Sequence, residues 1–361
     1  MLTFKKNLIS ISAFLFLLPF SFALPHVTPT VPDFSGQYVY YKDSSFARES
    51  YIGILYYDEN TYALRYYAPQ IGKGKDFKPE KSVHILFTVN PEKTNLELTG
   101  ERIISTIQPD DTDLINFIHE FFYEMTARRQ NAGIITENKS LYQEYEQYGG
   151  DVTVYYNPLI PIFNMEKIDS VDKKTILQVA SVGQLVSAED QSFAKFSGIN
   201  EKISDKNHKF KKNKKAKPLP ISYKAREESQ PLTAEIDTSW KAVAENFYLL
   251  GEVASFTVNE VTAGDKASDS SVNQIDILKR RLLMGSDMTF SDWSKLKIEE
   301  DKNSLLFRQV FYNLESDSYT YDFKFLKKID EKTFGLYTLT VFAGAYEPNR
   351  KYFENIVKSF K

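Results

Sequence analysis

The first half of the chain alternates apolar and polar residues in short segments that are rich in Tyr, Val and Ile. Such segments, bounded by turn residues, predict β-strands. Asp58, Glu59 and Asn60 separate two of them, which predicts a hairpin with a short loop. Pro158 and Pro161 make one segment an edge strand or an irregular one. The strands are expected at 36–41, 50–57, 61–68, 83–89, 94–101, 151–156, 159–164 and 174–183.

The spacing of apolar residues changes between 111 and 129. Acidic residues precede this segment and two arginines lie near its end, as the helix dipole favours. The spacing therefore predicts a helix over 111–129, because an apolar face that recurs every three to four residues is typical of an amphipathic helix. The apolar positions are Leu114, Ile118, Phe121, Phe122 and Met125.

The second half of the chain repeats this mixture of strands and amphipathic helices. Two strands are expected within 241–261, and others at 304–314, 318–329 and 333–346. A helix is expected at 272–284, because Gly285 follows its last turn. Another begins at Pro348, a residue suited to the first turn. The apolar stripe of this last helix is formed by Tyr352, Phe353, Ile356, Val357 and Phe360.

A lysine-rich stretch separates the two halves. Eight lysines against Glu201 and Asp205 give 201–220 a net charge of +6, whereas the whole chain carries −3. Like charges extend a chain, and so few apolar residues do not support a core, so the stretch predicts a solvated linker. The pattern as a whole predicts an α+β protein of two domains, 24–200 and 221–361. Each domain is expected to be a mainly antiparallel sheet with a few packed helices.

The N-terminus has the layout of a secretory signal peptide. Lys5 and Lys6 precede an apolar run over 8–22, and the small residues Ser21 and Ala23 precede an expected cut. The run is short for a membrane span of about 20 apolar residues, and an uncleaved anchor is the alternative. We expect residues 1–23 to be removed, which leaves a secreted or periplasmic protein without a transmembrane span.

The lysines of the linker have a functional interpretation as well. Exported proteins rarely meet nucleic acid, so nucleic acid is not an expected partner of these lysines. Their charge would instead suit an anionic surface such as lipid head groups, or an acidic protein. The candidate binding residues are Lys209, Lys211, Lys212, Lys214 and Lys215.

Several catalytic classes are excluded by composition and spacing. The chain has no cysteine, which excludes thiol nucleophiles, disulfides, zinc fingers and iron–sulfur clusters. His119 and Glu120 begin an H-E-x-x-H pattern, but Tyr123 stands where the second histidine is required. The acidic segment 109–113 lacks the Gly and Glu of an EF-hand, and 72–75 lacks the spacing of a P-loop. No catalytic residue, metal or cofactor is therefore predicted.

Tyrosines concentrate on the two strands expected at 50–57 and 61–68. Because neighbouring residues of a strand lie on opposite faces, these rings are expected on both faces of the sheet. One face would pack in the core, and the other would be partly exposed and suited to a protein or glycan contact. Packing of both faces is the alternative. The candidate residues are Tyr51, Tyr57, Tyr62, Arg65 and Tyr67.

The closing stretch 336–361 resembles the end of PsbP/Mog1-like modules, in which a last strand leads into a C-terminal helix. The resemblance implies an antiparallel sheet covered by helices on its faces. It also implies a binding or assembly accessory rather than an enzyme. The residues that carry it are Phe353, Ile356, Val357, Ser359 and Phe360.

These observations favour an exported, non-catalytic binding or assembly protein of the bacterial cell envelope. Its partner would be an envelope protein or an anionic surface. Two other classes stay open. A secreted hydrolase would combine His84 or His119 with carboxylates from distant parts of the chain. A carrier would hold an apolar ligand in a cavity between sheet and helix.

Overall fold

The computed structural model describes residues 35–45, 49–58, 61–76, 78, 81–89, 98–106, 112–145, 150–185, 208–224, 227, 230–262, 274–284, 289–313 and 316–361. The expected signal peptide, residues 1–23, lies outside the described residues. So does the first part of the expected linker, 201–207.

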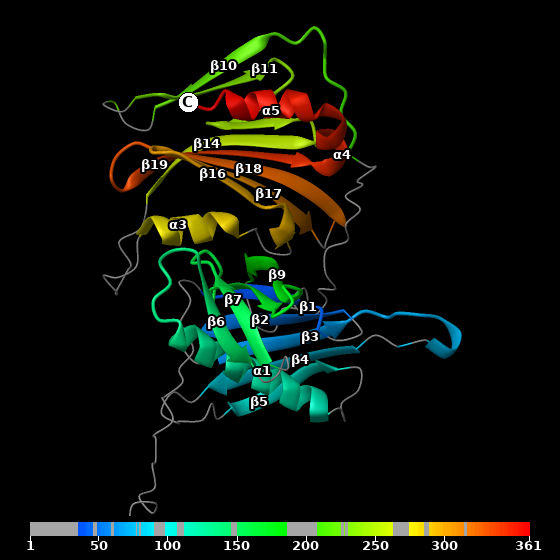
Figure 1. Ribbon diagram of the computed structural model, residues 1–361. Helices are drawn as coiled ribbons and strands as arrows, with labels where there is room; N and C mark the ends of the chain where they lie inside the picture. The colour runs from blue at the N-terminus through cyan, green and yellow to red at the C-terminus, as the bar shows by residue number, and fades with distance from the viewer. Residues whose placement is uncertain are drawn as a thin grey trace, which may run out of the picture.

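The N-terminal half forms one nine-stranded antiparallel sheet, in the order β5-β4-β3-β2-β1-β9-β8-β7-β6 (Figure 1). Its central pair, β1 and β9, joins the beginning and the end of this half. The short 3-10 helix η1 (Gly74–Asp76) lies between β3 and β4. The strands are β1 (Gln37–Asp43), β2 (Ser50–Asp58), β3 (Thr61–Ala68), β4 (Lys81–Val89), β5 (Leu98–Thr106), β6 (Lys139–Tyr145), β7 (Gly150–Tyr156), β8 (Met165–Ser170) and β9 (Thr175–Gln184).

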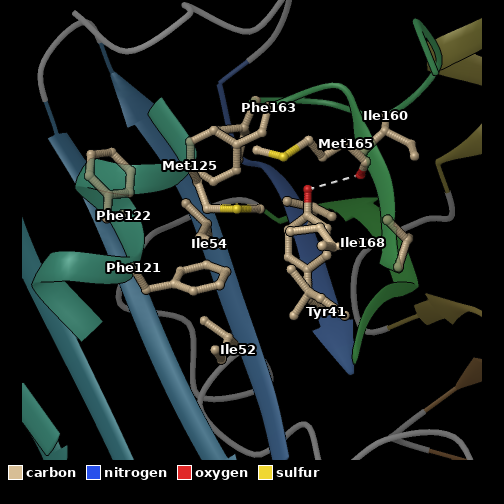
Figure 2. Packing of buried hydrophobic residues seen from close by; sticks show 14 of the residues in the cluster. Tyr41, Ile52, Ile54, Phe121, Phe122, Met125, Ile160, Phe163, Met165 and Ile168 are labelled. Carbon is tan, nitrogen blue, oxygen red and sulfur yellow. Dashed lines mark hydrogen bonds between the residues drawn. The ribbon is translucent and has the colours of Figure 1, made fainter. Parts of the chain in front are cut away.

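Helix α1 (Thr112–Asn131) connects the two edge strands β5 and β6 and therefore crosses one face of the sheet. Phe121, Phe122 and Met125 are buried against strand residues that alternate to this face, such as Ile54 (Figure 2). The ring of Phe122 lies 5.1 Å from that of Tyr62, in the edge-to-face geometry that aromatic pairs prefer. The predicted helix is confirmed.

The segment 159–164 was expected to be an edge strand or an irregular segment, and it is the second of these, a buried loop. Ile162 and Asn164 have positive φ angles of 69° and 52°, which no strand contains. Asn164 Nδ2 donates to the carbonyl of Ile160 at 2.7 Å and so holds the turn. Because Ile160 and Ile162 are buried in the core that α1 covers, the apolar run reflects burial of a loop.

The C-terminal half forms an eight-stranded antiparallel sheet and a separate two-stranded one. The larger sheet has the order β12-β13-β14-β19-β18-β17-β15, and β16 also pairs with β17; β10 pairs with β11. The strands are β10 (Pro218–Tyr223), β11 (Leu232–Asp237), β12 (Lys241–Ala244), β13 (Phe247–Leu250), β14 (Ala254–Thr262), β15 (Thr289–Ser291), β16 (Lys297–Glu300), β17 (Ser304–Asn313), β18 (Ser318–Lys328) and β19 (Thr333–Phe342). The helices are α3 (Gln274–Leu283), η3 (Trp293–Lys295), α4 (Ala343–Tyr346), η4 (Glu347–Asn349) and α5 (Arg350–Lys358).

Helices α3 and α5 cover opposite faces of the larger sheet (Figure 1). The C-terminal helix and the residues after it bury Phe353 and Phe360, and the ring of Phe360 stacks 4.8 Å from that of Tyr337 on β19. On the other face, α3 packs Leu278 on strand residues such as Phe307. The structure thus has two sheet-rich regions with few helices, in which strands predominate.

Aromatic side chains join the two regions: Trp293 packs against the core under α1 and the core under α3, and Phe290 enters the other face of the N-terminal sheet. Phe290 on β15 is fully buried in a cluster whose other buried members all come from the N-terminal half. Its ring lies 5.5 Å from that of Tyr38 and 6.0 Å from that of Tyr40. The N-terminal sheet therefore has a core on both faces, one under α1 and one around Phe290.

Polar contacts surround Phe290, which is here called the plug. The Ser291 hydroxyl accepts from the Val182 amide at 3.0 Å and lies 2.7 Å from the Val182 carbonyl, to which it donates. This exchange occurs where β9 extends beyond its pairing with β8. Trp293 Nε1 donates to Glu166 at 3.3 Å, and Arg280 donates to the Pro158 carbonyl at 3.0 Å.

Candidate functional site

The predicted tyrosine surface is not exposed. Tyr62 and Arg65 are 0% and 2% exposed, and Tyr51 and Tyr67 are buried as well. Only Tyr57, at 37%, is exposed among the five candidates. The expectation of an open face is therefore wrong, and the alternative of packing on both faces holds for this hairpin.

Arg65 and His84 lie opposite each other in the register of β3 and β4, on the face that contains Phe290 rather than α1. The Arg65 guanidinium lies 5.3 Å from the centre of the Tyr67 ring. Burial raises the pKa of the Tyr40 hydroxyl well above its usual value, although the charge of Arg65 opposes the rise. His84 is 0% exposed, so no surface of its ring is available to a substrate. The side chain of His119 lies outside what the structure describes.

The residues 208–217, here called the lysine segment, are held against the C-terminal sheet. The His208 ring stacks on Phe342 with 3.7 Å between the ring centres and 6° between the planes. Phe210 packs 5.6 Å from Tyr352 of α5, and its carbonyl accepts from Asn349 Nδ2 at 2.9 Å. Two aromatic rings therefore anchor the first part of the segment.

The second part of the segment is fixed through backbone groups. The Ala216 amide donates to the Asn213 carbonyl at 3.2 Å, which closes a turn. The Lys217 amide donates to the Thr238 hydroxyl at 3.1 Å, and the Thr238 amide donates to the Lys217 carbonyl at 2.9 Å. Strand β10 begins at Pro218, so the last part of the expected linker belongs to a sheet.

The lysines of this segment are all exposed. In the described part of the chain no carboxylate lies within ion-pair distance of them. The ammonium group of Lys212 lies 5.1 Å from the centre of the Tyr352 ring. Lys351 and Lys358 are exposed on the adjoining helix α5. The exposed lysines are Lys209, Lys211, Lys212, Lys214, Lys215 and Lys217.

The signal for this anchoring was present in the sequence. Phe210 is an aromatic residue within a run of charged ones, and it follows His208 by two positions. A free linker has no need for such a ring. The many lysines of the segment led to the prediction of a solvated linker. The partners of the Phe210 ring, Tyr352 and Phe353 on α5, lie far along the chain and could not be recognised from it.

A second polar cluster lies on the α3 face of the C-terminal sheet. Lys324 Nζ donates to the Leu282 carbonyl at 2.5 Å, and Gln309 Nε2 donates to the Leu283 carbonyl at 2.9 Å, so both cap the end of α3. Asp322 lies opposite Gln309 in the strand register. Burial raises the pKa of the Asp322 carboxyl and lowers the pKa of the Lys324 ammonium.

A cavity of about 390 Å³ opens at the end of the same sheet, between the first turn of α3 and the β16–β17 and β18–β19 turns. Four apolar and seven polar side chains line it, so it is not the closed apolar cavity that a carrier of wholly apolar ligands requires. No sequence signal marked it, because its walls come from five separate elements. The apolar residues are Ile275, Leu305, Leu326 and Phe334.

Metal and membrane features were sought in the same residues. Within the described ranges no three His, Asp or Glu side chains gather in a way that would hold a metal ion. Among these residues there is also no helix of the length and apolar character needed to cross a membrane.

Two family models match the chain, one for each half. Residues 36–194 match a domain of unknown function, DUF7954, and residues 224–361 match another, DUF7955. No curated protein matches the sequence. The first match spans the nine-stranded sheet, and the second begins directly after β10.

Proposed function

We propose that this protein is an exported, non-catalytic binding protein of the bacterial cell envelope, and that the lysine segment attaches it to an anionic lipid surface. The observation that carries the proposal is the anchoring of the segment at both ends while its six lysines remain exposed. Six ammonium groups are thereby presented on one fixed strip of the C-terminal domain.

The chemistry of the strip favours a lipid surface over an acidic protein. Lysine is a compact, strongly hydrated charge without the planar fork by which arginine grips a carboxylate. The residues that dominate protein interfaces are enriched in buried aromatic and arginine side chains. Phe210, the aromatic residue of the segment, is directed to the protein's own core instead.

Anchoring makes the lysines more effective than a free linker would. Each lysine near an anionic bilayer contributes on the order of 1 kcal/mol. A segment that is already ordered loses little conformational freedom on binding. Attraction of this kind falls with salt, because the Debye length shortens.

Export and family are parts of the same proposal. The signal-peptide pattern of residues 1–23 supports a secreted or periplasmic location. The C-terminal sheet with helices on both faces supports the expected likeness to PsbP/Mog1-like modules. A likeness of fold alone does not carry function, so the binding proposal rests on the lysine segment.

Vesicle co-sedimentation tests the proposal on the mature chain, residues 24–361. We expect binding to vesicles that contain phosphatidylglycerol, little binding to pure phosphatidylcholine, and release at high salt. A variant with Lys211, Lys212, Lys214 and Lys215 changed to Gln should bind up to about a thousandfold more weakly, since four contributions near 1 kcal/mol are removed and about 1.4 kcal/mol is a tenfold change.

A matched control separates the segment from net charge. Lys173, Lys174, Lys295 and Lys297 are exposed lysines on other elements, and their change to Gln removes the same total charge. This control should bind anionic vesicles like the unaltered protein. Equal loss in both variants, or no binding by the unaltered chain, contradicts the proposal. Binding to an acidic protein but not to vesicles would show that the partner is a protein.

A further inference from the structure

The end of α3 lies at the contact between the two halves of the chain. Helix α3 is on the side of the C-terminal sheet that faces the N-terminal half (Figure 1). Arg280 of α3 donates to the Pro158 carbonyl. The sulfur of Met284, directly after the helix, accepts from Gln37 Nε2 at 3.7 Å. The polar cluster that caps this end of α3 is therefore placed where it can act on both halves.

The chain after α3 leads into β15, which carries the plug. Tyr38, the neighbour of Gln37 on β1, donates its hydroxyl to the Thr289 carbonyl at 3.2 Å. The Phe290 ring packs against the ring of the same tyrosine. Strand β1 thus contacts the chain just after α3 and again at β15, so the position of the helix end bears on the contact made by the plug.

Two side chains of the sheet cap the last turn of α3. Lys324 Nζ donates to the Leu282 carbonyl, and Gln309 Nε2 donates to the Leu283 carbonyl. The last carbonyl groups of a helix have no partner within the helix, so these donors replace the missing bonds. Because a carbonyl oxygen can only accept, the Leu283 contact also fixes the Gln309 amide with its nitrogen toward α3.

Asp322 lies beside both of these donors. It is opposite Gln309 in the strand register, and it is on the same face of β18 as Lys324, two residues further along. Its Oδ1 atom and the Oε1 atom of Gln309 are buried, and neither has a hydrogen-bond partner in the part of the chain that the structure describes. The carboxyl and the two caps of α3 therefore form one cluster.

Few charges surround this carboxyl. Among the described residues, Lys324 is the charged group that acts on it, and the hydroxyls of Thr320 and Thr340 hydrogen-bond to it. In the last turn of α3, Arg280 is directed to the N-terminal half and Arg281 is exposed. Ionisation of the carboxyl is therefore opposed by burial and assisted by one ammonium group.

We propose that Asp322 is a pH-sensitive switch: once ionised, its carboxylate draws the Lys324 and Gln309 donors away from α3 and so loosens the contact between the two halves. Hydrogen bonds to a carboxylate are stronger than those to a carbonyl, because the charge assists them. While the carboxyl is protonated, it donates to Gln309 Oε1 instead, and both caps stay on α3. The switch is independent of the lipid attachment proposed above.

The direction of the switch follows from burial, which raises the pKa of the Asp322 carboxyl. The closed contact is fully stabilised below the pKa of an exposed Asp, about 3.9, and this stabilisation is lost as the pH rises through the raised pKa. Since one proton is released to solvent, the open population should grow by up to about tenfold per pH unit over that interval and then level off.

Amide hydrogen exchange of the mature chain, residues 24–361, tests the switch when it is followed by mass spectrometry between about pH 4 and pH 9. At each pH the unaltered chain is compared with Asp322→Asn, which cannot ionise and has the same sequence, and so the same intrinsic exchange rates, in α3 and β15. In these two elements the ratio of exchange rates, unaltered chain over variant, should be near one in acid and grow as the pH rises. Helix α5, on the other face of the sheet, should keep a ratio near one throughout.

Gln309→Met is a second variant, because it removes one cap of α3 at every pH. Its α3 should exchange faster than that of the unaltered chain already in acid, with a smaller further rise toward high pH. A ratio that stays at one over the whole range for Asp322→Asn overturns the proposal, as does a ratio that grows when the pH falls. Faster exchange in α3 with unchanged exchange in β15 would overturn the link between the switch and the contact of the halves.

Discussion

Asp322 and Gln309 face each other across the β17–β18 pair, and each keeps one buried acceptor. Asp322 Oδ1 and Gln309 Oε1 have no hydrogen-bond partner among the described residues. Two acceptor oxygens can form a hydrogen bond with each other only if one of them carries a proton. Burial raises the pKa of the Asp322 carboxyl, which favours its protonated form. Lys324 on the same strand and Thr340 on β19 oppose the rise but do not reverse it.

The pH dependence of this carboxyl has a definite sign. A carboxyl whose pKa is raised by folding stabilises the folded state fully below its unfolded pKa of about 3.9. That contribution is lost as the pH rises through the raised pKa. Asp322→Asn keeps the shape and a donor but cannot ionise. The free energy of unfolding of the variant, measured in urea, should therefore equal that of the unaltered protein near pH 4 and exceed it at pH 8.

Asp301 supplies the opposite control. Amide donors lower its pKa, so its contribution is present above the unfolded pKa and is lost as the pH falls. Asp301→Asn should therefore be the less stable chain at neutral pH, with a difference that shrinks in acid. If the difference between Asp322→Asn and the unaltered protein does not change with pH, Asp322 does not titrate as inferred.

The burial or exposure of a residue could be predicted only where its neighbours in the sequence determine it. The exposure of Lys212 and Lys214 followed from composition, since no apolar residue adjoins them in the sequence. The burial of Tyr51 and Tyr67 did not, because alternation shows only that a strand has two faces. Phe290, which packs in the cluster on their face, lies more than two hundred residues away in the chain.

At the scale of elements, amphipathic periodicity was the reliable signal. It located α1 and α5: Phe121, Phe122 and Met125 of α1 and Phe353, Ile356 and Val357 of α5 are buried as their spacing predicts. Periodicity did not predict the short strands β15 and β16, because they contain only three and four residues. The stretch 241–261 forms three strands rather than two, because the chain turns at Asn246 and Gly251, whose φ angles of 57° and 55° no periodicity shows.

Strand β10 was missed for a related reason. Its prolines, Pro218 and Pro220, argue against a central strand but are tolerated on an edge. β10 has one partner, β11, and so is such an edge. The charge of the preceding lysines then extended the expected linker over it.

The anchoring of the lysine segment can be tested on Phe210. Phe210→Ala removes the packing on Tyr352 and Phe353 while all six lysines stay. Phe210 is half-exposed, so the loss of global stability should be smaller than the about 3–5 kcal/mol of a fully buried Phe. Local opening should rise, and trypsin should cleave within 209–217 faster than in the unaltered chain under native conditions.

Tyr57→Ala is the matched control, because it removes an aromatic ring that is already exposed. Its rate of cleavage in the lysine segment should not change. Unchanged cleavage in Phe210→Ala as well would show that the segment is held by its backbone contacts at Thr238 rather than by its rings.

At the scale of the whole molecule, the two halves pack together around Phe290, and Trp293 and Leu159 add further apolar contacts between them. The cluster that surrounds it has its remaining buried members in the N-terminal sheet, and Ser291 pairs with the backbone of Val182 beside it. The two regions should therefore unfold as one cooperative unit while this plug is in place. Each region has its own larger core, so each can persist when the plug is removed.

Phe290→Ala should uncouple the two sheets. Truncation of a fully buried Phe costs about 3–5 kcal/mol, and here the cavity falls between two folded regions rather than within one. Trp293 contacts both halves, whereas Trp240 lies in the C-terminal core. In a Trp293→Phe background, fluorescence therefore follows the C-terminal half while far-UV circular dichroism follows both. The two urea curves should coincide for this background and separate when Phe290→Ala is added. Phe360→Ala, a truncation within the C-terminal core, controls for general destabilisation: its curves should reach their midpoints at lower urea without the same separation. Coincident curves with an unchanged slope for Phe290→Ala would mean that the remaining contacts, such as that of Arg280, suffice to couple the two halves.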